Sequence, residues 1–156
     1  SFHPDADCYG LIQDDVIFCR GLKKFLEAVL WPSEKTGFVS VFTPSHYARK
    51  VPGFYKTNKG GKLWMAQTLF FPPSSVHNLL GHSICLEHKS DRNIDNVVGK
   101  WAKATDRYPY YFCPSLAQHI GVKSTLWNNK NNQADGRKSA SDFVGEDYDI
   151  GHGLDG

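Results

Sequence analysis

Two short apolar runs near the start of the chain are separated by a group of polar residues. From Tyr9 to Phe18 the chain is almost wholly apolar except at Gln13, Asp14 and Asp15. An ionised carboxylate that is buried without a partner costs on the order of several kcal/mol. We therefore predict a buried strand that is interrupted at these acids, so that they lie at the end of the strand rather than inside the core.

Periodic apolar positions farther along the chain predict helices and strands in alternation. We expect Pro32 to end the first helix, and Ser74 or Ser75 to cap the second. The predicted helices lie within residues 20–31, 74–80 and 91–103, and the further strands within 37–43, 63–71 and 108–114. Because strands alternate with helices, we expect an α/β fold with a mixed, mostly parallel sheet flanked by helices.

The length and the composition of the chain fit one globular domain. The chain has 156 residues, of which 40% are hydrophobic and 13% aromatic, and this is enough to form a core. After Trp127 the sequence becomes polar, and from Gly145 onward it is acidic and rich in glycine. We therefore expect a single α/β domain over residues 1–127, followed by a polar loop and an acidic, glycine-rich tail over 128–156.

The charge of the chain bears on whether it binds nucleic acid, and its cysteine content bears on the cellular compartment. The chain has 18 Lys and Arg against 16 Asp and Glu, and the basic residues are scattered, so we expect no nucleic-acid partner. No apolar run is long enough to cross a bilayer. The four cysteines form no CxxC pair. We expect them to be small buried side chains in a reducing, cytoplasmic protein, with two disulfides as the alternative.

Asp14, Asp15 and His119 are the residues with the clearest potential for chemistry. Ligands in open α/β sheets gather beyond the carboxyl ends of strands, and two acids there suit a divalent cation such as Mg²⁺ or Mn²⁺. A neutral imidazole is also a common metal ligand. The alternatives are a turn or a helix cap formed by the two acids, and a histidine held by a hydrogen bond. A metal-dependent hydrolase using these three residues is a further, weaker hypothesis.

Four successive segments resemble the C-terminal part of glycosyltransferases with the GT-A fold. They read YGLIQDDVIFCRGLKKFL, LWMAQTLFFPPSSVHNLL, NIDNVVGKWAK and PSLAQHIGVKSTLW, and they are spread over residues 9–127. The resemblance is to families with a Glu-Asp-Asp metal motif and a later Pro-Ser-Leu-x-Gln-His-x-Gly segment. These families include N-acetylglucosaminyltransferase-like and lipopolysaccharide-type enzymes.

The resemblance implies a metal site and binding of a nucleotide-sugar donor. It makes Asp15 a direct ligand of Mn²⁺ or Mg²⁺, with Asp14 supporting it or meeting the donor sugar. It makes His119 a ligand of the metal or of the diphosphate. Gln13 stands where these families usually have an acid, which removes one negative charge and weakens the expected affinity for metal.

The resemblance also implies residues that meet the acceptor. It makes Asp95 a catalytic carboxylate at a helix start that takes a proton from the acceptor hydroxyl, although an acid in a first turn is favourable without any catalytic duty. It places Trp64 and Gln67, with Gln13, beside the sugars. Trp64 and Trp101 have the ring area to stack on a carbohydrate, but aromatic residues at such spacing are more often part of a core.

The resemblance leaves the N-terminal nucleotide-binding portion of such enzymes unaccounted for, since only eight residues precede Tyr9. We therefore expect either the C-terminal catalytic part of a longer glycosyltransferase, acting on a nucleotide-sugar and a carbohydrate acceptor, or a non-catalytic binding or assembly module that has lost donor binding. A sheet without its first strands exposes an edge, so we also expect self-association into a homo-oligomer.

Overall fold

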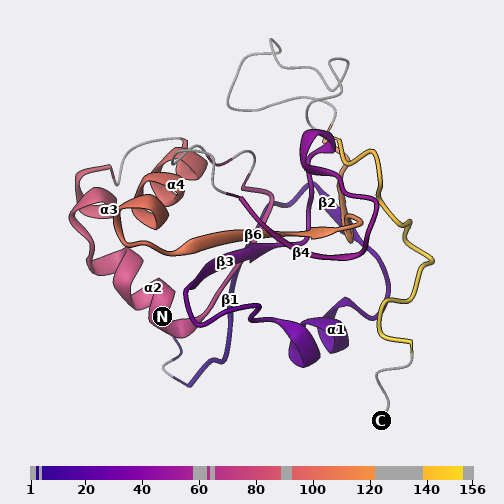
Figure 1. Ribbon diagram of the computed structural model, residues 1–156, viewed down its shortest axis with the longest axis horizontal. Helices are drawn as coiled ribbons and strands as arrows, with labels where there is room; N and C mark the ends of the chain where they lie inside the picture. The colour runs from indigo at the N-terminus through magenta and orange to yellow at the C-terminus, as the bar shows by residue number, and fades with distance from the viewer. Residues whose placement is uncertain are drawn as a thin grey trace.

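A five-stranded sheet forms the centre of the protein. The computed structural model describes residues 3, 5–57, 63, 66–88, 93–121 and 139–152. The strands follow the order β1-β5-β3-β6-β4 across the sheet (Figure 1). Their bounds are β1 Tyr9–Ile12, β3 Thr36–Ser40, β4 Gly53–Lys56, β5 Thr68–Phe71 and β6 Tyr108–Cys113.

A second, smaller sheet lies beside the first and contains two short strands. β2 (Val16–Phe18) pairs in antiparallel direction with β7 (Ala117–His119). The register places Val16 opposite His119. The predicted interruption at the acids is confirmed, because residues 13–15 separate β1 from β2, but the two strands belong to different sheets and neither is fully buried as we expected.

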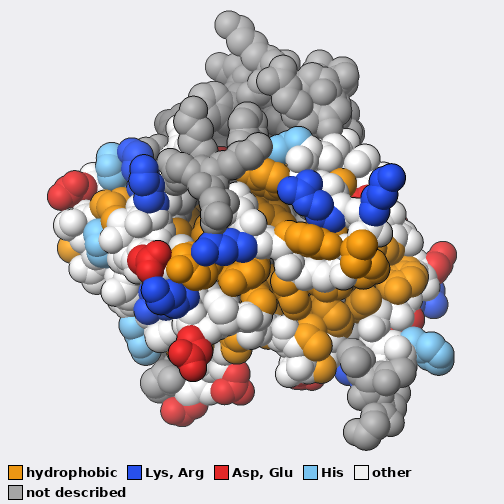
Figure 2. All heavy atoms as spheres, viewed as in Figure 1, with side chains coloured by type: hydrophobic (Ala, Val, Ile, Leu, Met, Phe, Trp, Pro, Cys, Tyr) orange, Lys and Arg blue, Asp and Glu red, His pale blue; other side chains and the backbone are white. Residues whose placement is uncertain are grey.

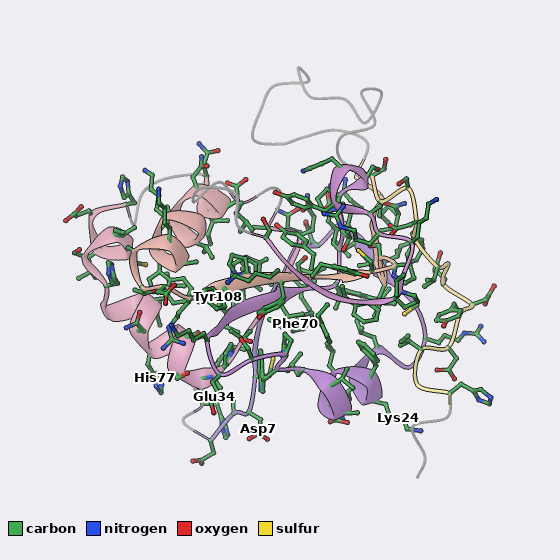
Figure 3. All side chains as sticks on the ribbon, in the orientation of Figure 1. Asp7, Lys24, Glu34, Phe70, His77 and Tyr108 are labelled. Carbon is green, nitrogen blue, oxygen red and sulfur yellow. The ribbon has the colours of Figure 1, made fainter. Side chains whose placement is uncertain are left out.

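The helices cover the two faces of the central sheet unequally. α2 (Pro73–Gly81), α3 (Ser83–Glu87) and α4 (Ile94–Ala104) lie together on one side, and α1 (Leu22–Val29) lies on the other (Figure 1). β5 is buried on both faces: Leu69 and Phe71 pack in the core under α2 and α4, while Phe70 packs in the core that contains Phe25 of α1. Figure 3 shows the Phe70 side chain on the α1 side of the sheet.

The sheet is mixed but mostly antiparallel, which corrects our expectation of a mostly parallel sheet. Among the described strands, β3 and β6 form the one parallel pair, while β1–β5, β5–β3 and β4–β6 are antiparallel. A helix between two strands favours a parallel crossover, but α1 leads from the smaller sheet into β3. In addition, β4 lies in a glycine-containing stretch where we predicted no strand. The mixed α/β class itself is confirmed.

The start of α2 differs from the predicted serine cap for a physical reason. Pro72 occupies the N-cap position and Pro73 the first turn, where a missing N–H is harmless. Ser75 is fully buried instead: its hydroxyl donates a hydrogen bond to the carbonyl of Thr36 at 2.9 Å and accepts one from Arg107 at 2.9 Å. Its side chain therefore joins the helix to the sheet rather than capping the helix.

The described part of the predicted loop and tail, residues 139–152, packs against the domain although it forms no helix. Ala140 is buried in the same core as Phe25, and Phe143, Val144 and Ile150 pack against that core. The backbone of Asp149 forms a parallel bridge with Arg20. The tail is irregular in structure, but its apolar residues contribute to the core.

Basic side chains and thiols are dispersed over the fold. In Figure 2, Lys and Arg side chains lie singly over the visible face.

All four cysteines are free thiols: Cys19 and Cys113 are buried, while Cys8 and Cys85 are half-buried. None of the helices in the described ranges has the length and apolar character to span a membrane.

Candidate functional site

Asp15 and His119, two of the predicted metal ligands, meet at one end of the small sheet. Asp15 immediately precedes β2, and His119 is the last residue of β7. The backbone carbonyl of Asp15 accepts a hydrogen bond from the Ile120 N–H at 2.9 Å, which fixes the two chain segments side by side. His119 Nε2 and Asp15 Oδ2 then form a hydrogen bond of 2.9 Å, which is the alternative that the sequence left open for this histidine.

Gly121 allows this close approach. A Cβ atom at position 121 would lie 2.1 Å from Asp15 Oδ2 and 3.0 Å from His119 Nε2. Contacts as short as 2.1 Å do not occur between a Cβ and a carboxylate oxygen, so any larger residue would displace the acid. The missing side chain at Gly121 therefore lets the Asp15 carboxylate lie against the backbone beside His119 Nε2.

The pair is partly withdrawn from water and retains binding capacity. The side chain of His119 is 11% exposed and that of Asp15 is 35% exposed. Asp15 Oδ1 is buried and accepts no hydrogen bond from the part of the chain that the structure describes. A buried carboxylate oxygen without a donor is unfavourable, and a cation would compensate it.

The distance between the two facing atoms fits a shared cation. An octahedral cation with ligand distances of about 2.1 Å holds two neighbouring ligand atoms about 3 Å apart, close to the 2.9 Å observed here. Within the described ranges, no group of three or more His, Cys, Asp and Glu side chains is placed to hold a metal. A cation bound at Asp15 and His119 would therefore complete its shell with water or with ligand oxygens, as Mg²⁺ commonly does.

The other predicted ligand, Asp14, is exposed in the turn between β1 and β2. Its neighbour Gln13 is also exposed, and the Gln13 N–H donates a hydrogen bond to the carbonyl of Gln67 at 2.9 Å. Gln67 is only 5% exposed, and its Oε1 accepts no hydrogen bond from a described residue. Gln13 and Gln67 thus lie together at the end of β1 that leads to the acids, while Trp64 lies outside the described residues.

Asp95, the predicted catalytic base, lies in the first turn of α4. One of its carboxylate oxygens accepts a hydrogen bond from the Asn96 N–H at 2.9 Å. Figure 1 draws α4 well away from β2, and no described contact joins Asp95 to Asp15 or His119. Trp101 on the same helix is fully buried and donates a hydrogen bond to Asn78 Oδ1 at 2.8 Å, so it is a core residue.

Gln118 supports the site through contacts that no sequence pattern predicts. Its amide nitrogen donates to the carbonyl of Ala140 at 3.0 Å, and its amide oxygen accepts from the Ala140 N–H at 3.0 Å. The two bonds attach residue 140 to β7 next to His119. The sequence offers no signal for this pair, because Ala140 lies in a polar stretch without periodicity.

Comparison with known proteins finds no relative that would indicate a function for this chain. No protein-family model matches the chain, and no curated protein is similar to it at a significant level. The geometry of Asp15, His119 and Gly121 is therefore the main basis for a functional proposal.

Proposed function

We propose that the protein is a metal-dependent glycosyltransferase, or the C-terminal catalytic part of one, that transfers a sugar from a nucleotide-sugar to an acceptor hydroxyl. The observation that carries the proposal is the meeting of Asp15 Oδ2 and His119 Nε2 at 2.9 Å. The four segments that resemble GT-A enzymes and the mixed α/β sheet support it. We propose accordingly that the sheet corresponds to the C-terminal part of a GT-A fold.

The reaction needs a site that stabilises negative charge on a leaving diphosphate. A bound Mn²⁺ or Mg²⁺ would supply Lewis-acid neutralisation of that charge. Asp15 and His119 are the residues that would hold the ion, and Gly121 permits their close approach. Asp14, exposed in the same turn, is available to the donor sugar or to water in the shell of the ion. Gln13 and Gln67 are the proposed sugar contacts.

The acceptor hydroxyl must lose a proton when it attacks the sugar. The resemblance assigns this proton to the Asp95 carboxylate, whereas a general base must lie within hydrogen-bond reach of that hydroxyl and α4 lies well away from β2 (Figure 1). Asp95 lies apart from the Asp15–His119 pair in the described contacts, so its role needs a test that is separate from metal binding. We propose Asp95→Asn for this purpose, with the prediction that the variant still binds metal and nucleotide but transfers sugar at least about 100-fold more slowly.

A non-catalytic module derived from a GT-A enzyme is the second candidate. The observation that favours it is that two side chains meet at the site rather than three, within the described part of the chain. A site with one carboxylate and one imidazole carries less negative charge than a site with two or more carboxylates, and it therefore binds a divalent cation more weakly than such a site does. Such a module would bind metal weakly and show no sugar transfer.

Calorimetric titration with MnCl₂, in the presence of uridine or guanosine diphosphate, tests the proposal. We expect saturable binding by the full chain, a loss of at least about tenfold in affinity in Asp15→Asn, and a smaller loss in His119→Gln. Asp147→Asn is the matched control, because Asp147 is a 93% exposed acid that pairs with Arg20. Binding that Asp15→Asn leaves unchanged, or no binding by the folded protein, would overturn the proposed site.

A further inference from the structure

β1 is an edge strand whose outward-facing backbone groups can be identified. In the described sheet it pairs with β5 on one side and with no strand on the other. The Gln13 N–H donates a hydrogen bond to the carbonyl of Gln67. Backbone groups in an antiparallel pair face the partner strand at every second residue, so those of Tyr9 and Leu11 also face β5. Gly10 and Ile12 therefore present their N–H and C=O groups at the outer edge, where they are available to an added strand.

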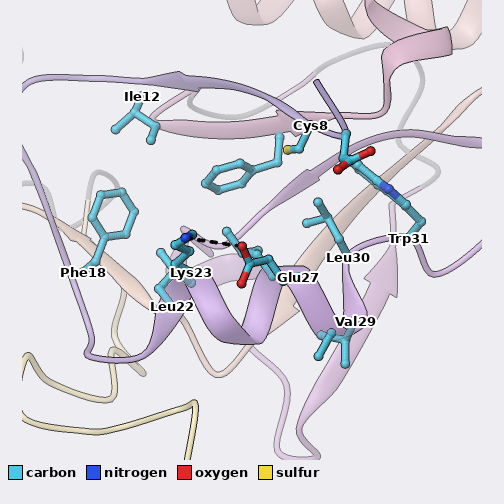
Figure 4. Close-up of a pocket in the computed structure, with 13 residues that line it drawn as sticks. Cys8, Ile12, Phe18, Leu22, Lys23, Glu27, Val29, Leu30 and Trp31 are labelled. Atoms are coloured by element: carbon cyan, nitrogen blue, oxygen red, sulfur yellow. Dashed lines mark ion pairs between the residues drawn. The ribbon is translucent and has the colours of Figure 1, made fainter. Parts of the chain in front are cut away.

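A largely apolar cavity lies between this edge and α1. Its volume is about 840 Å³, and the Lys23–Glu27 ion pair of 3.5 Å lies at its rim (Figure 4). Ile12, a residue that is 48% exposed, points toward it from β1 (Figure 4). The other apolar side chains that form its walls include Cys8, Phe18, Leu22, Leu26 and Phe70.

Acidic residues stand at both ends of the edge. Asp5 and Asp7 precede β1 and are exposed, and Asp14 follows it and is exposed. Figure 3 shows Asp7 at the surface. Lys23 at the cavity rim is paired with Glu27, so it does not balance these acids. The edge therefore combines unpaired backbone groups, an apolar cavity and negative charge at each end.

The charges argue against a second copy of this chain at the same edge. An antiparallel pair that matches Gly10 of each copy with Ile12 of the other would bring the exposed Asp7 of one copy near the exposed Asp14 of the other. Like charges directly opposite each other destabilise a strand pair. The same acids would attract basic residues that flank a partner strand.

We propose that β1 binds an extended segment of a partner polypeptide as an added strand. The segment has alternate apolar side chains, which enter the cavity between β1 and α1, and Lys or Arg at both ends. Its backbone bonds the outward groups of Gly10 and Ile12. Strand addition of this kind takes its affinity from main-chain hydrogen bonds and its selectivity from the alternate side chains. It does not depend on the transferase activity.

A short peptide, acetyl-Lys-Val-Thr-Val-Thr-Val-Lys-amide, tests the proposal by NMR on the full chain. We expect saturable binding and at least about tenfold slower hydrogen exchange at the Gly10 and Ile12 amides. Gly10→Pro should weaken binding at least about tenfold, whereas Gly10→Ala should retain it within about twofold. Both variants add a Cβ atom, which would lie 3.4 Å from the Phe70 ring, but only proline removes the outward N–H.

Changes in the peptide provide a second test that leaves the protein unaltered. Replacing both lysines by glutamate should weaken binding at low salt, and high salt should reduce the difference. N-methylation of the peptide amides on the edge that faces β1 should abolish binding. N-methylation of the amides on the opposite edge of the peptide should leave binding intact. Equal binding of both methylated peptides, equal binding by Gly10→Pro, or no saturable binding would overturn the proposal. Protection of Gly10 and Ile12 that rises with protein concentration alone would overturn it in favour of a second copy.

Discussion

Asp15 and His119 are 104 residues apart in the chain, and their side chains meet at 2.9 Å. The register of β2 and β7 produces this contact, because Val16 and His119 are direct partners. A slip of one residue would turn the His119 side chain to the opposite face of the small sheet. The Leu116 carbonyl continues this register by accepting from the Cys19 N–H at 3.0 Å, while its N–H anchors the segment to the central sheet by donating to the Val41 carbonyl at 2.9 Å.

Gly121→Ala should destroy the candidate metal site by occupying its space. The new methyl group would lie 2.1 Å from Asp15 Oδ2, so the carboxylate must move away from His119. We expect a loss of about 1–3 kcal/mol in the free energy of unfolding. We also expect Mn²⁺ affinity to fall at least about tenfold, as for loss of a supporting residue at a metal site. Urea unfolding and calorimetry measure the two effects.

Gly81→Ala is the matched control for this variant. Gly81 ends α2, and a Cβ there would meet no atom within 4 Å. The alanine should leave Mn²⁺ affinity unchanged and keep or raise stability, by up to about 1 kcal/mol. Equal Mn²⁺ affinity in Gly121→Ala and Gly81→Ala would show that the space beside Asp15 is not used for binding.

Ser115→Ala should weaken the start of β7 through a buried hydroxyl. Ser115 is fully buried, and its Oγ accepts from the Thr43 N–H at 3.0 Å and donates to the carbonyl of Ala117 at 2.7 Å. The alanine leaves the Thr43 N–H without this acceptor, which costs about 1–3 kcal/mol of unfolding free energy. Ser141→Ala, at an exposed position, should change stability by less than about 0.5 kcal/mol. Similar urea midpoints for the two variants would contradict this role.

Elements with a strong apolar pattern could be predicted from the sequence, and those that depend on a partner could not. α1 and α4 show apolar residues at helical spacing, and the structure confirms both. β4 was missed because its four residues follow a polar stretch, and it is stabilised by pairing with β6, where Phe54 packs against Phe112 at 4.9 Å between ring centroids. β7 has only three residues, Ala117–His119, too few to show any alternation.

The same distinction applies to the candidate site. Residue type, the predicted strand end and the resemblance to GT-A enzymes made Asp15 and His119 candidate ligands. Their contact depends on the β2–β7 register, which no short-range pattern encodes. For the same reason, the position of Asp95 relative to the site could not be derived from its place at a helix start. The strand directions were predicted wrongly because a helix between two strands does not reveal which sheet each strand joins.

The Cys8 thiol should react slowly with alkylating agents. The pKa of Cys8 is raised from 9.0 to about 11, mainly by burial, which outweighs the lowering by the Phe71 backbone and is assisted by the nearby charge of Asp7. At pH 8 the reactive thiolate should therefore be about 100-fold rarer than in an unstructured cysteine peptide. Peptide mapping after timed iodoacetamide treatment measures the rate. A rate at Cys8 equal to that of the unstructured peptide would contradict the raised pKa.

The same shift in the pKa of Cys8 predicts a pH dependence of stability. The folded state holds the thiol proton more tightly than the unfolded state, so the contribution of Cys8 is fully present below the unfolded pKa of 9.0. It is lost as the pH rises from there through about 11, the folded value. Cys8→Ser should make the unfolding free energy fall less steeply across this range. Parallel stability curves for the two proteins would exclude the effect.

Gly21→Ala should release the C-terminal segment from α1. Gly21 has φ of 69°, a left-handed conformation that costs other residues about 1–2 kcal/mol. A Cβ there would also lie 2.2 Å from Asp149 Oδ1 and 2.6 Å from the Gly151 nitrogen, so the segment must move. The Ile150 N–H, which bonds the carbonyl of Arg20 at 3.1 Å, reports this movement.

Hydrogen exchange at Ile150 separates release of the segment from backbone strain at Gly21. Strain alone lowers global stability but leaves the Ile150–Arg20 bond intact in the folded state. Displacement of the segment breaks that bond, so hydrogen exchange at the Ile150 amide should accelerate at least about tenfold. The exchange of amides in β3 should change only as much as the change in global stability requires. Gly145→Ala is the control, since Gly145 also has a positive φ, 95°, but a Cβ there meets no atom within 4 Å. If both variants accelerate Ile150 equally, contact between Gly21 and Asp149 does not hold the segment in place.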